Sequence, residues 1–564
     1  MLIDFVTNLS FFGRASFHPA SPADHHLGLL VIIVPVIGGF IVGLMARYGS
    51  SAIRGHGIPE AMEQVLFNES RISPRVAIFK PLSAAVSIGT GGPFGAEGPI
   101  IATGGALGSI VGQFMKITAA ERKTLLAAGA AAGMTAVFGT PVAAVLLAIE
   151  LLLFEYRASS IIPVSLATVA AMAVRIFFGG TAAFTTIVVP MTQPTEAALA
   201  LYVGMGVIFG IISVLLVRLL YLIEDGFEKI HLHWMWWPMI GGLGVGIVGF
   251  FDPRTLGIGY ENINHIVNGD FGLYALLTLG VLKLISWEVS IGSGTSGGTL
   301  APLFTIGGAL GGALGGVAAH LWPQAGIDPR LAALIGMAAV FTGASHAFLA
   351  SVVFAFEISR QPLGLLPLLG CCSAAYLISS ICMKTTIMTE KIYRRGRKVP
   401  NEYVPDYLSH VPVKEICSRH LVALQADDSA QKAREWVVSG ISGSTHQGFP
   451  VLEKDGSLIG VITLKDLMPG QLPPQTTVRE LVKRTPLVIY DDSSVREAVD
   501  IMAQEQIGRL PVVSRKDPRK ILAMLTRSDV LSVGRRRLEE TGRRKTIYSV
   551  KPLLLKVLYQ RKAG

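Results

Sequence analysis

Apolar residues dominate positions 28–383, and the remainder of the chain mixes polar and apolar residues as ordinary soluble proteins do. Other than four long stretches, the apolar pieces are short and stop at clusters of Gly and Pro. The four long stretches reach the roughly 20 residues that a membrane-spanning helix needs: Leu27–Arg47, Leu125–Leu153, Ala197–Leu222 and Leu363–Met383. The pattern predicts an all-α polytopic membrane region of about a dozen or more helical pieces, several of which do not cross the whole bilayer.

The apolar region contains an internal duplication. PIIATGGALG at 99–108 recurs as PLFTIGGALG at 302–311, an offset of 203 residues. GMTAVF at 133–138 recurs with the same offset as GMAAVF at 336–341. Duplicated membrane halves with Gly/Pro-interrupted segments at corresponding positions are typical of transporters that bind their substrate near the bilayer midplane.

Three Gly/Pro clusters precede apolar helix-like runs: GHGIP at 55–59, GAEGP at 95–99 and GGTLAP at 297–302. A helix that begins inside the membrane exposes its first backbone N–H groups and the positive end of its dipole. Proline suits the first helical position, and glycine lets a ligand approach the N–H groups. Three such starts converging would hold an anion without a full positive charge. The alternative is that the glycines only allow close helix packing. Close packing explains the GGALG runs, but it does not explain why Gly and Pro occur together before each helix.

Glu97 is the most informative residue, because an acidic side chain inside a membrane is costly and by default marks function. It lies in GAEGP, within a stretch from Gly89 to Phe114 that is otherwise uncharged. When ionised it is a carboxylate placed where an anion would bind, so protonation or movement of the side chain would open the path. The competing interpretation is a helix cap, for which Ser, Thr and Asp are better suited than Glu.

The tail carries a second duplication. Residues 411–467 and 478–531 each predict a strand and a helix, then a strand–turn–strand that ends in a Thr-x-x-Asp helix start, GVITLKDL and AMLTRSDV. A small α/β module therefore follows the all-α membrane region. The predicted boundaries are an N-terminal segment 1–27, a membrane region 28–395 in halves of about 28–223 and 235–395, a linker 396–410, the tandem module 411–535 and a basic tail 536–564.

Composition and charge exclude several classes. Hydrophobic residues make up 51% of the chain and charged residues 16%, against about 25% charged in soluble domains. The apolar region has no nucleophile–base pair or metal-ligand pattern, so we expect no enzyme activity and no required cofactor. The net charge is +10, and the basic run at 391–398 predicts a cytoplasmic module by the positive-inside rule. The basic runs lack interleaved aromatic residues, which favours contact with membrane lipid over nucleic acid. Without a visible signal peptide or targeting sequence, we expect the plasma or inner membrane.

Three ordered motifs give the membrane region a resemblance to the CLC family of chloride channels and chloride–proton antiporters. GHGIP resembles the family's GSGIP, GAEGP its GREGP and GGTLAP its GGxFxP, and Lys80 matches a basic position of the family. The resemblance implies a homodimer with one chloride pathway per subunit, each subunit being built from two inverted halves. It also implies that Glu97 is the gating glutamate.

The resemblance further implies which positions bind the anion: His56, Gly57, Ile58, Gly298, Thr299, Leu300 and Met388. Four residues depart from the family pattern, because His56 replaces a serine, Ala96 an arginine and Leu300 a phenylalanine, and Met388 stands near the position of a tyrosine. A fluoride-selective relative is therefore an alternative to a chloride pathway. His56 is either an N–H donor that makes the site sensitive to pH or a neutral packing residue.

The two units of the tail closely resemble CBS domains, which pack in pairs. In pairs that bind adenine nucleotides (ATP, ADP or AMP), the Thr and Asp positions hold ribose and phosphate, which implicates Thr463, Asp466, Thr526 and Asp529. The alternative is ordinary helix capping by these residues. Ala523 replaces a glycine common at the nucleotide site, so a structural dimerisation module stays open beside a nucleotide sensor.

Proton coupling in the CLC family depends on an internal pair of glutamates. Glu150 aligns with the structural member of the pair and Leu151 with the proton-carrying member. Since leucine cannot carry a proton, the sequence favours a channel-like or weakly coupled pathway over a proton-coupled antiporter, unless Glu155 substitutes. A CBS-regulated divalent-cation transporter is a further alternative. Hard cations need several oxygen ligands, and only Glu97, Glu150 and Glu357 are candidates.

Overall fold

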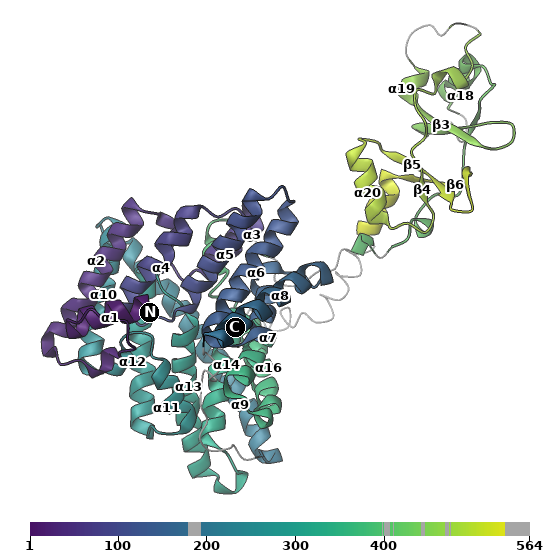
Figure 1. Ribbon diagram of the computed structural model, residues 1–564. Coiled ribbons are helices and arrows are strands. Elements are labelled where there is room, and N and C mark those ends of the chain that lie inside the picture. The colour runs from purple at the N-terminus through teal and green to yellow at the C-terminus, as the bar shows by residue number, and fades with distance from the viewer. Residues whose placement is uncertain are drawn as a thin grey trace, which may run out of the picture. The chain divides into compact units, whose positions relative to one another are not determined.

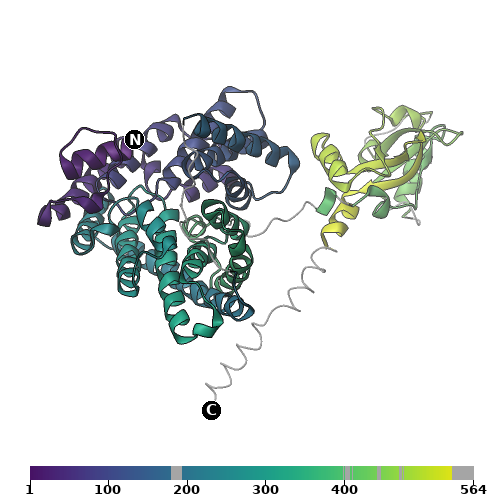
Figure 2. The same ribbon diagram turned by 60° about the horizontal axis from the view of Figure 1, so that its bottom comes forward.

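The computed structural model describes residues 1–178, 193–397, 399, 407–409, 411–440, 446–468, 473 and 475–535. Most of the predicted linker 396–410 and the whole predicted basic tail 536–564 lie outside the described residues. The chain divides into two compact units, Met1–Tyr403 and Val404–Gly564. The first unit is the helical part in Figures 1 and 2, and the strands found in the described residues belong to the second unit.

The first half of the helical unit, coloured purple to blue in Figure 1, consists of eight α-helices and one π-helical turn in the described residues. These are α1 (Leu2–Phe12), α2 (Ile33–Tyr48), α3 (Ile58–Phe67), α4 (Pro74–Gly89), α5 (Glu97–Phe114), α6 (Ala119–Phe138), α7 (Pro141–Leu147), the π-helical η4 (Ala148–Leu153) and α8 (Ala158–Phe177). The expected single span Leu125–Leu153 is wrong. Gly139 takes a left-handed φ of 68° that ends α6, and Pro141 then begins α7.

The second half, coloured teal to green, repeats this order. Its helices are α9 (Glu196–Glu228), α10 (Trp237–Phe251), α11 (Tyr260–Asn268), α12 (Leu273–Gly292), α13 (Leu300–Leu321), α14 (Pro329–Ser345), α15 (Phe348–Ser359), α16 (Leu365–Cys382) and α17 (Glu390–Arg394). Among the described residues, seven helical segments are long and apolar enough to cross a membrane. The prediction of a polytopic region with additional shorter helices is confirmed.

Two glutamates relate the halves by reciprocal contacts. The Glu150 carboxylate accepts hydrogen bonds of 2.9 and 3.0 Å from the backbone N–H groups at the start of α15. The Glu357 carboxylate accepts bonds of 3.1 and 2.8 Å from the N–H groups at the start of α7. Each half therefore caps a helix of the other with the same residue type. Such an exchange is the signature of a two-fold relation between the halves.

Two buried lysines repeat the same relation inside each half. Lys80 of α4 and Lys283 of α12 are separated by the offset of the sequence repeat, and each donates to two backbone carbonyls of the loop before a short helix. The acceptors are Ile53 and Gly55 for Lys80, at 2.8 and 2.7 Å, and Thr255 and Gly257 for Lys283, at 2.9 and 3.1 Å. The lysines thereby fix the loops that lead into α3 and α11.

The glycine-rich runs bring neighbouring helices into backbone contact. A Cβ added at Gly104 of α5 would lie 2.2 Å from the Gly129 carbonyl oxygen of α6. In the second half, a Cβ at Gly307 of α13 would lie 2.4 Å from the Gly336 carbonyl oxygen of α14. Close helix packing, the alternative considered for the GGALG runs, is therefore their structural role.

The second unit contains two copies of one small α/β motif, as the tail repeat predicts. The first consists of β1 (Leu424–Gln425), α18 (Ala430–Val438), β2 (Gly448–Leu452), β3 (Leu458–Thr463) and α19 (Leu464–Leu467). The second consists of β4 (Ile489–Tyr490), α20 (Val495–Gln504), β5 (Arg509–Ser514), β6 (Asp517–Thr526) and a helix from residue 527. In each copy the first strand pairs in parallel with the second and the second in antiparallel with the third. A bridge between Ser457 and Lys520 joins the copies.

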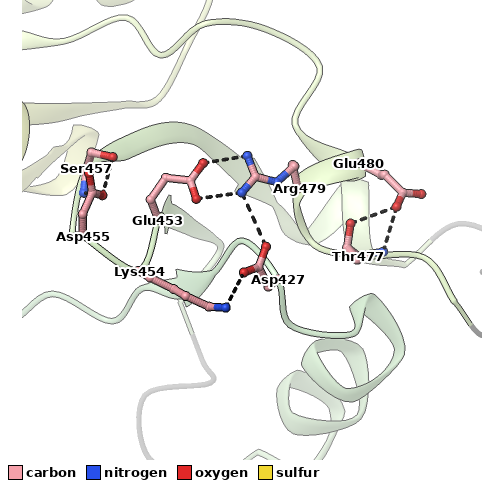
Figure 3. A network of polar contacts seen from close by, with 8 residues as sticks. All are labelled: Asp427, Glu453, Lys454, Asp455, Ser457, Thr477, Arg479 and Glu480. Carbon is pink, nitrogen blue, oxygen red and sulfur yellow. Dashed lines mark hydrogen bonds and ion pairs between the residues drawn. The ribbon is translucent and has the colours of Figure 1, made fainter.

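An exposed ion-pair network covers one edge of the first copy (Figure 3). Arg479 donates to both carboxylate oxygens of Glu453, at 2.6 and 2.7 Å, and lies 3.4 Å from Asp427. Lys454 completes the network at 3.2 Å from Asp427, and its hydrogen bond holds the pKa of that carboxyl below the usual range. The network ties the segment after β3 to the β2–β3 hairpin, and exposed pairs of this kind contribute little to stability.

Candidate functional site

The three Gly/Pro motifs meet in space. The Gly298 N–H donates to the Gly95 carbonyl at 3.0 Å, which joins the starts of α13 and α5. A Cβ at Gly98 would lie 1.9 Å from the His56 carbonyl oxygen, so the start of α5 also touches the start of α3. Gly57 has a φ of 92°, which only glycine adopts readily, and a Cβ there would meet the Gly98 carbonyl. Glycine is needed at these positions because three helix starts converge on one point.

The prolines lie one or two residues further into the helices than the first position. Pro59 is the second residue of α3, and Pro99 and Pro302 are the third residues of α5 and α13. Their missing N–H groups still fall within the first turn, where helical N–H groups have no partner within the helix.

Glu97 reaches across to a different helix. Its side chain is 1% exposed, and its Oε1 accepts a hydrogen bond of 2.6 Å from the Ala301 N–H in the first turn of α13. Its Oε2 has no hydrogen-bond partner among the described residues. A Cβ at Gly298 would lie 2.5 Å from Oε2. The carboxylate thus occupies the start of α13, where the sequence predicts an anion.

Two of the predicted N–H donors are bonded to protein atoms. Besides Gly298, the Gly57 N–H donates at 2.7 Å to Oε2 of Glu60, the third residue of α3. Sequence reasoning missed Glu60, although its position three residues after the start of a Gly-Ile-Pro helix is that of a capping box. It also missed Ala301, the residue directly after the predicted Gly298–Leu300 segment.

Two of the motif residues carry buried polar side-chain atoms. Among the described residues, the Thr299 hydroxyl and the His56 Nδ1 are buried and have no hydrogen-bond partner. Tyr260, at the start of α11, lies beside Ala96 and Glu97. Ile58 and Leu300 are buried, and their side chains are apolar. The site therefore offers N–H and O–H donors to an anion and no full positive charge within the motifs.

Met388 is fully buried in the loop before α17. Its N–H donates to the Thr386 hydroxyl at 3.2 Å, and its side chain supplies no hydroxyl. The phenol of Tyr221 in α9 donates to the carbonyl of Ile387, the residue before Met388, at 3.0 Å. Tyr221 was not predicted, because α9 and this loop are more than 160 residues apart in the sequence.

A cavity of about 820 Å³ leads to His56 from one side of the helical unit. Its charged lining residues are Arg54, Glu60, Glu63, Glu224, Glu228, Lys391, Arg394 and Arg395. Lys391 lies 3.4 Å from Glu60, and Arg395 pairs with Glu63. We call this cavity the vestibule. Three of its basic residues, Lys391, Arg394 and Arg395, belong to the run that the positive-inside rule predicts to be cytoplasmic.

Leu151, which the family resemblance aligns with a proton-carrying glutamate, has no titratable group. Leu151 is buried in the main apolar cluster. Both carboxylate oxygens of Glu150 accept hydrogen bonds from N–H groups at the start of α15. Glu155 accepts a hydrogen bond of 2.8 Å from Ser160 and lies 3.9 Å from Lys123. Glu150 is therefore a structural residue of the repeat.

In the soluble unit, both Thr-x-x-Asp pairs form capping boxes. The Thr463 hydroxyl donates to Asp466 at 2.6 Å, and the Thr526 hydroxyl donates to Asp529 at 2.7 Å. Asp466 also accepts a bond of 2.7 Å from Lys483. The capping role considered as the alternative is present, and a nucleotide would have to compete with these bonds.

Broken, duplicated helices whose starts meet around a buried carboxylate define an integral membrane transport protein with a soluble α/β pair. Residues 38–380 match the family model described as voltage gated chloride channel, and residues 413–470 and 478–536 match the CBS domain model. The chain belongs to the voltage-gated chloride channel (CLC) family, and its C-terminal soluble part is a tandem CBS pair.

Relatives and solved structures agree with this assignment. Chloride channel protein CLC-f of Arabidopsis thaliana is 26% identical over 607 residues, which cover 92% of this chain and 75% of the plant protein. The H(+)/Cl(−) exchange transporter ClcA of Yersinia pestis bv. Antiqua (strain Angola) is 31% identical over 365 residues, which cover 62% of this chain and 74% of ClcA. A slow cyanobacterial Cl−/H+ antiporter has the same fold, with a TM-score of 0.62 at 22% identity, covering 70% of this chain and 92% of that one. A eukaryotic CLC transporter has a TM-score of 0.58 at 20% identity and covers 94% and 93%.

These comparisons confirm the predicted family, fold class, membrane location and CBS pair. The family is one of anion transport, either through channels or by proton/chloride antiport. The family assignment gives no support to the divalent-cation alternative.

Proposed function

We propose that this chain conducts chloride through a pathway that the Glu97 carboxylate closes. The observation that carries the proposal is the 2.6 Å hydrogen bond from the Ala301 N–H to Glu97. A helix start is a binding site for anions, and here a tethered carboxylate occupies it. Chloride and Glu97 therefore compete for one set of donors.

The gate opens when Glu97 loses its charge or moves away. A protonated carboxyl accepts a hydrogen bond less strongly than a carboxylate, so protonation releases the start of α13. The freed donors are then the Ala301 N–H and the unpartnered Thr299 hydroxyl. The vestibule supplies anions from the side of His56, and His56 faces that cavity as a further N–H donor.

Chloride is the proposed anion. The named activities of the relatives, a chloride channel and a chloride–proton exchanger, support this choice. His56 and Met388 stand where the family has hydroxyl groups, so fluoride is the second anion to test. No cofactor and no catalytic chemistry are part of the proposal.

The pathway is channel-like or only weakly coupled to protons. Leu151 cannot carry a proton, and both oxygens of Glu150 are bonded to the start of α15. A strictly coupled antiporter would need another acid.

Two features of the assembly complete the proposal. Apolar side chains such as Ile162, Leu166 and Val169 of α8 are exposed, which supports contact with membrane lipid. The homodimer is proposed from the resemblance to the CLC family. The CBS pair acts as a regulatory module. Thr463 and Thr526 already donate to Asp466 and Asp529 in the helix caps. To bind an adenine nucleotide, these four residues would have to contact it in addition to one another.

The test is chloride efflux from proteoliposomes that contain the full chain, measured from pH 4.5 to 7.5. Wild type is expected to conduct more at low pH, and Glu97→Gln is expected to lose this dependence. At pH 7.5 its flux should exceed that of wild type by about ten-fold, because exchanging a charged for a neutral acceptor costs roughly 1–1.5 kcal/mol.

Glu357→Gln is the matched control, since it removes the charge of a membrane glutamate that caps α7 instead of the anion site. It should keep the pH profile of wild type. Absence of chloride flux in wild type, or an unchanged pH profile in Glu97→Gln, would contradict the proposal.

A further inference from the structure

Arg54, in the loop before α3, is a basic residue of the vestibule that pairs with no carboxylate among the described residues. Its Nε is buried and has no hydrogen-bond partner in the same part of the chain. A guanidinium has five N–H donors and no acceptor, so one without a partner favours an anion. The other basic lining residues do pair with carboxylates: Lys391 with Glu60, Arg394 with Asp225 and Arg395 with Glu63.

Two tryptophans and a glycine hold the guanidinium in place. The Cζ of Arg54 lies 4.6 Å from the ring centroid of Trp234 and 5.8 Å from that of Trp237. The guanidinium also contacts the loop before α13, where a Cβ added at Gly294 would lie 2.7 Å from Nη2. An aromatic face stabilises a cation without neutralising its charge. Arg54 is therefore held in position and keeps its full charge.

The repeat shows that the scaffold does not require a charge at this place. Arg54 stands between the two carbonyls that the buried lysine of the first half binds, and Leu256 stands between the two that the lysine of the second half binds. A Cβ at Gly91 would lie 3.2 Å from Leu256, just as one at Gly294 would meet Arg54. Leu256 is 2% exposed. An apolar side chain therefore fills the related place in the second half, and the arginine belongs to one half only.

Arg54 stands beside the route from the vestibule to the anion site. It is two residues before His56, and both residues line the vestibule. Gly294 also lines it, in the loop that leads to α13. The loops into two of the converging helix starts thus meet at this guanidinium. An ion that moves through the vestibule toward His56 comes within reach of its N–H donors.

The charges near Arg54 favour a monovalent anion. Glu224 and Glu228 of α9 line the vestibule and interact electrostatically with Arg54. Their repulsion lowers the net attraction that the guanidinium exerts on an anion. The cost of removing an ion from water rises with the square of its charge, whereas this attraction rises only in proportion to the charge. The site therefore suits chloride better than sulfate or phosphate.

We propose that Arg54 is an entry site, which binds chloride in the vestibule before the ion reaches His56. The guanidinium donates N–H groups to the ion, and the tryptophan rings keep it in place as ions arrive and leave. Without this charge, an ion would meet the repulsion of Glu224 and Glu228 alone. Arg54 therefore sets the chloride concentration at which transport from the vestibule side saturates. This inference rests on the proposed chloride pathway and adds an anion site outside the three helix starts.

The test is the chloride current across planar lipid bilayers that contain the full chain. Chloride is varied on one face of the bilayer at a time, and the ionic strength is held constant with a large organic anion. Arg54→Leu copies the related residue of the second half, so it should fold. On one face only, it should raise the half-saturating chloride concentration about five-fold, the effect of losing a unit charge at about 4 Å in water.

Two further variants separate charge from packing. Arg54→Lys keeps the charge and should stay within about two-fold of wild type. Arg47→Gln is the matched control, because it removes a positive charge at the end of α2, next to His233, from a residue outside the vestibule lining. It should leave the half-saturating concentration unchanged on both faces.

The outcomes distinguish this inference from the proposed function. Absence of chloride current in wild type contradicts the chloride pathway itself. A chloride current with an unchanged half-saturating concentration in Arg54→Leu overturns only the role of Arg54. An equal increase in Arg54→Lys or in Arg47→Gln does the same, since the effect would then not depend on a charge at this position.

A second measurement uses the wild-type chain and covers an Arg54→Leu protein that does not fold. Bromide replaces chloride in crystals of the full chain, and its anomalous scattering locates bound ions. A peak should lie beside the Arg54 guanidinium and should persist when sulfate is added. Absence of the peak, or its loss to sulfate, overturns the inference.

Discussion

The two halves of the membrane region agree in their supporting contacts and differ in their acids. Lys80 and Lys283 bind equivalent loops, and Glu150 and Glu357 cap each other's helices across the two-fold relation. Each of these contacts satisfies backbone groups that would otherwise be buried without partners. Positions that are the same in both halves therefore carry the architecture.

The positions that differ carry the chemistry. Glu97 begins α5, whereas Leu300 stands at the corresponding start of α13. The two-fold relation alone would place two carboxylates at the point where the helix starts meet. Of these two related positions only Glu97 is an acid, and it binds the helix start that lacks an acid of its own. In the proposed pathway, this asymmetry leaves room for one anion and for one carboxylate that competes with it.

Restoring the symmetry should have the largest effect. Leu300→Glu would place a second carboxylate beside Glu97, and two like charges about 4 Å apart repel by roughly 1–4 kcal/mol at effective dielectric constants of about 80–20. We expect chloride efflux at pH 7.5 to fall by more than about ten-fold. Leu300→Gln is the matched control of similar shape, and an equal loss in both variants would show that size, not charge, matters at this position.

Breaking the symmetric caps should lower stability without changing the pH profile of transport. Glu150→Gln and Glu357→Gln each leave one of two helix-start N–H groups without an acceptor, at a cost of about 1–3 kcal/mol. Because the contacts are reciprocal, the two variants should lower the apparent melting temperature in detergent by similar amounts. A large difference between them would show that the halves are not equivalent in the way their geometry indicates.

The CBS pair gives a smaller version of the same comparison. Thr463→Val and Thr526→Val each remove a capping hydroxyl, and each should cost about 1 kcal/mol of stability. In the first unit, Lys483 also pairs with Asp466. Because Asp466 keeps this contact when the threonine hydroxyl is removed, Thr463→Val should lower the stability less than Thr526→Val. Thermal unfolding of the full chain followed by circular dichroism measures both, and a milder effect of Thr526→Val would contradict this order.

Local patterns in the sequence were sufficient for the helix starts and the CBS units. The Gly/Pro clusters are short local motifs, and they located the starts of α3, α5 and α13 to within two residues. The break at Gly139 was missed because a glycine within an apolar run does not reveal whether its φ is positive.

The contacts between the starts of α5 and α13 could not be predicted, since they join segments about 200 residues apart. Ala301 was missed for this reason: the 204 residues between it and Glu97 give no local signal. Tyr221 is a similar case. Glu288 of α12, a buried acid that sequence reasoning also missed, is different. An isolated acid in the apolar run KLISWEVSIG is visible in the sequence by the same argument that identified Glu97.

The reciprocal glutamate caps also have a consequence for synthesis. The start of α7 is complete only when Glu357 arrives, 215 residues after Val142. At about 5–20 residues per second, the ribosome needs roughly 10–40 s to supply that residue. During this interval the N–H groups at the start of α7 need water, lipid headgroups or the insertion machinery as temporary partners. Neither half would be finished as a separate polypeptide, so a fragment that ends between the halves should be a target for membrane quality control.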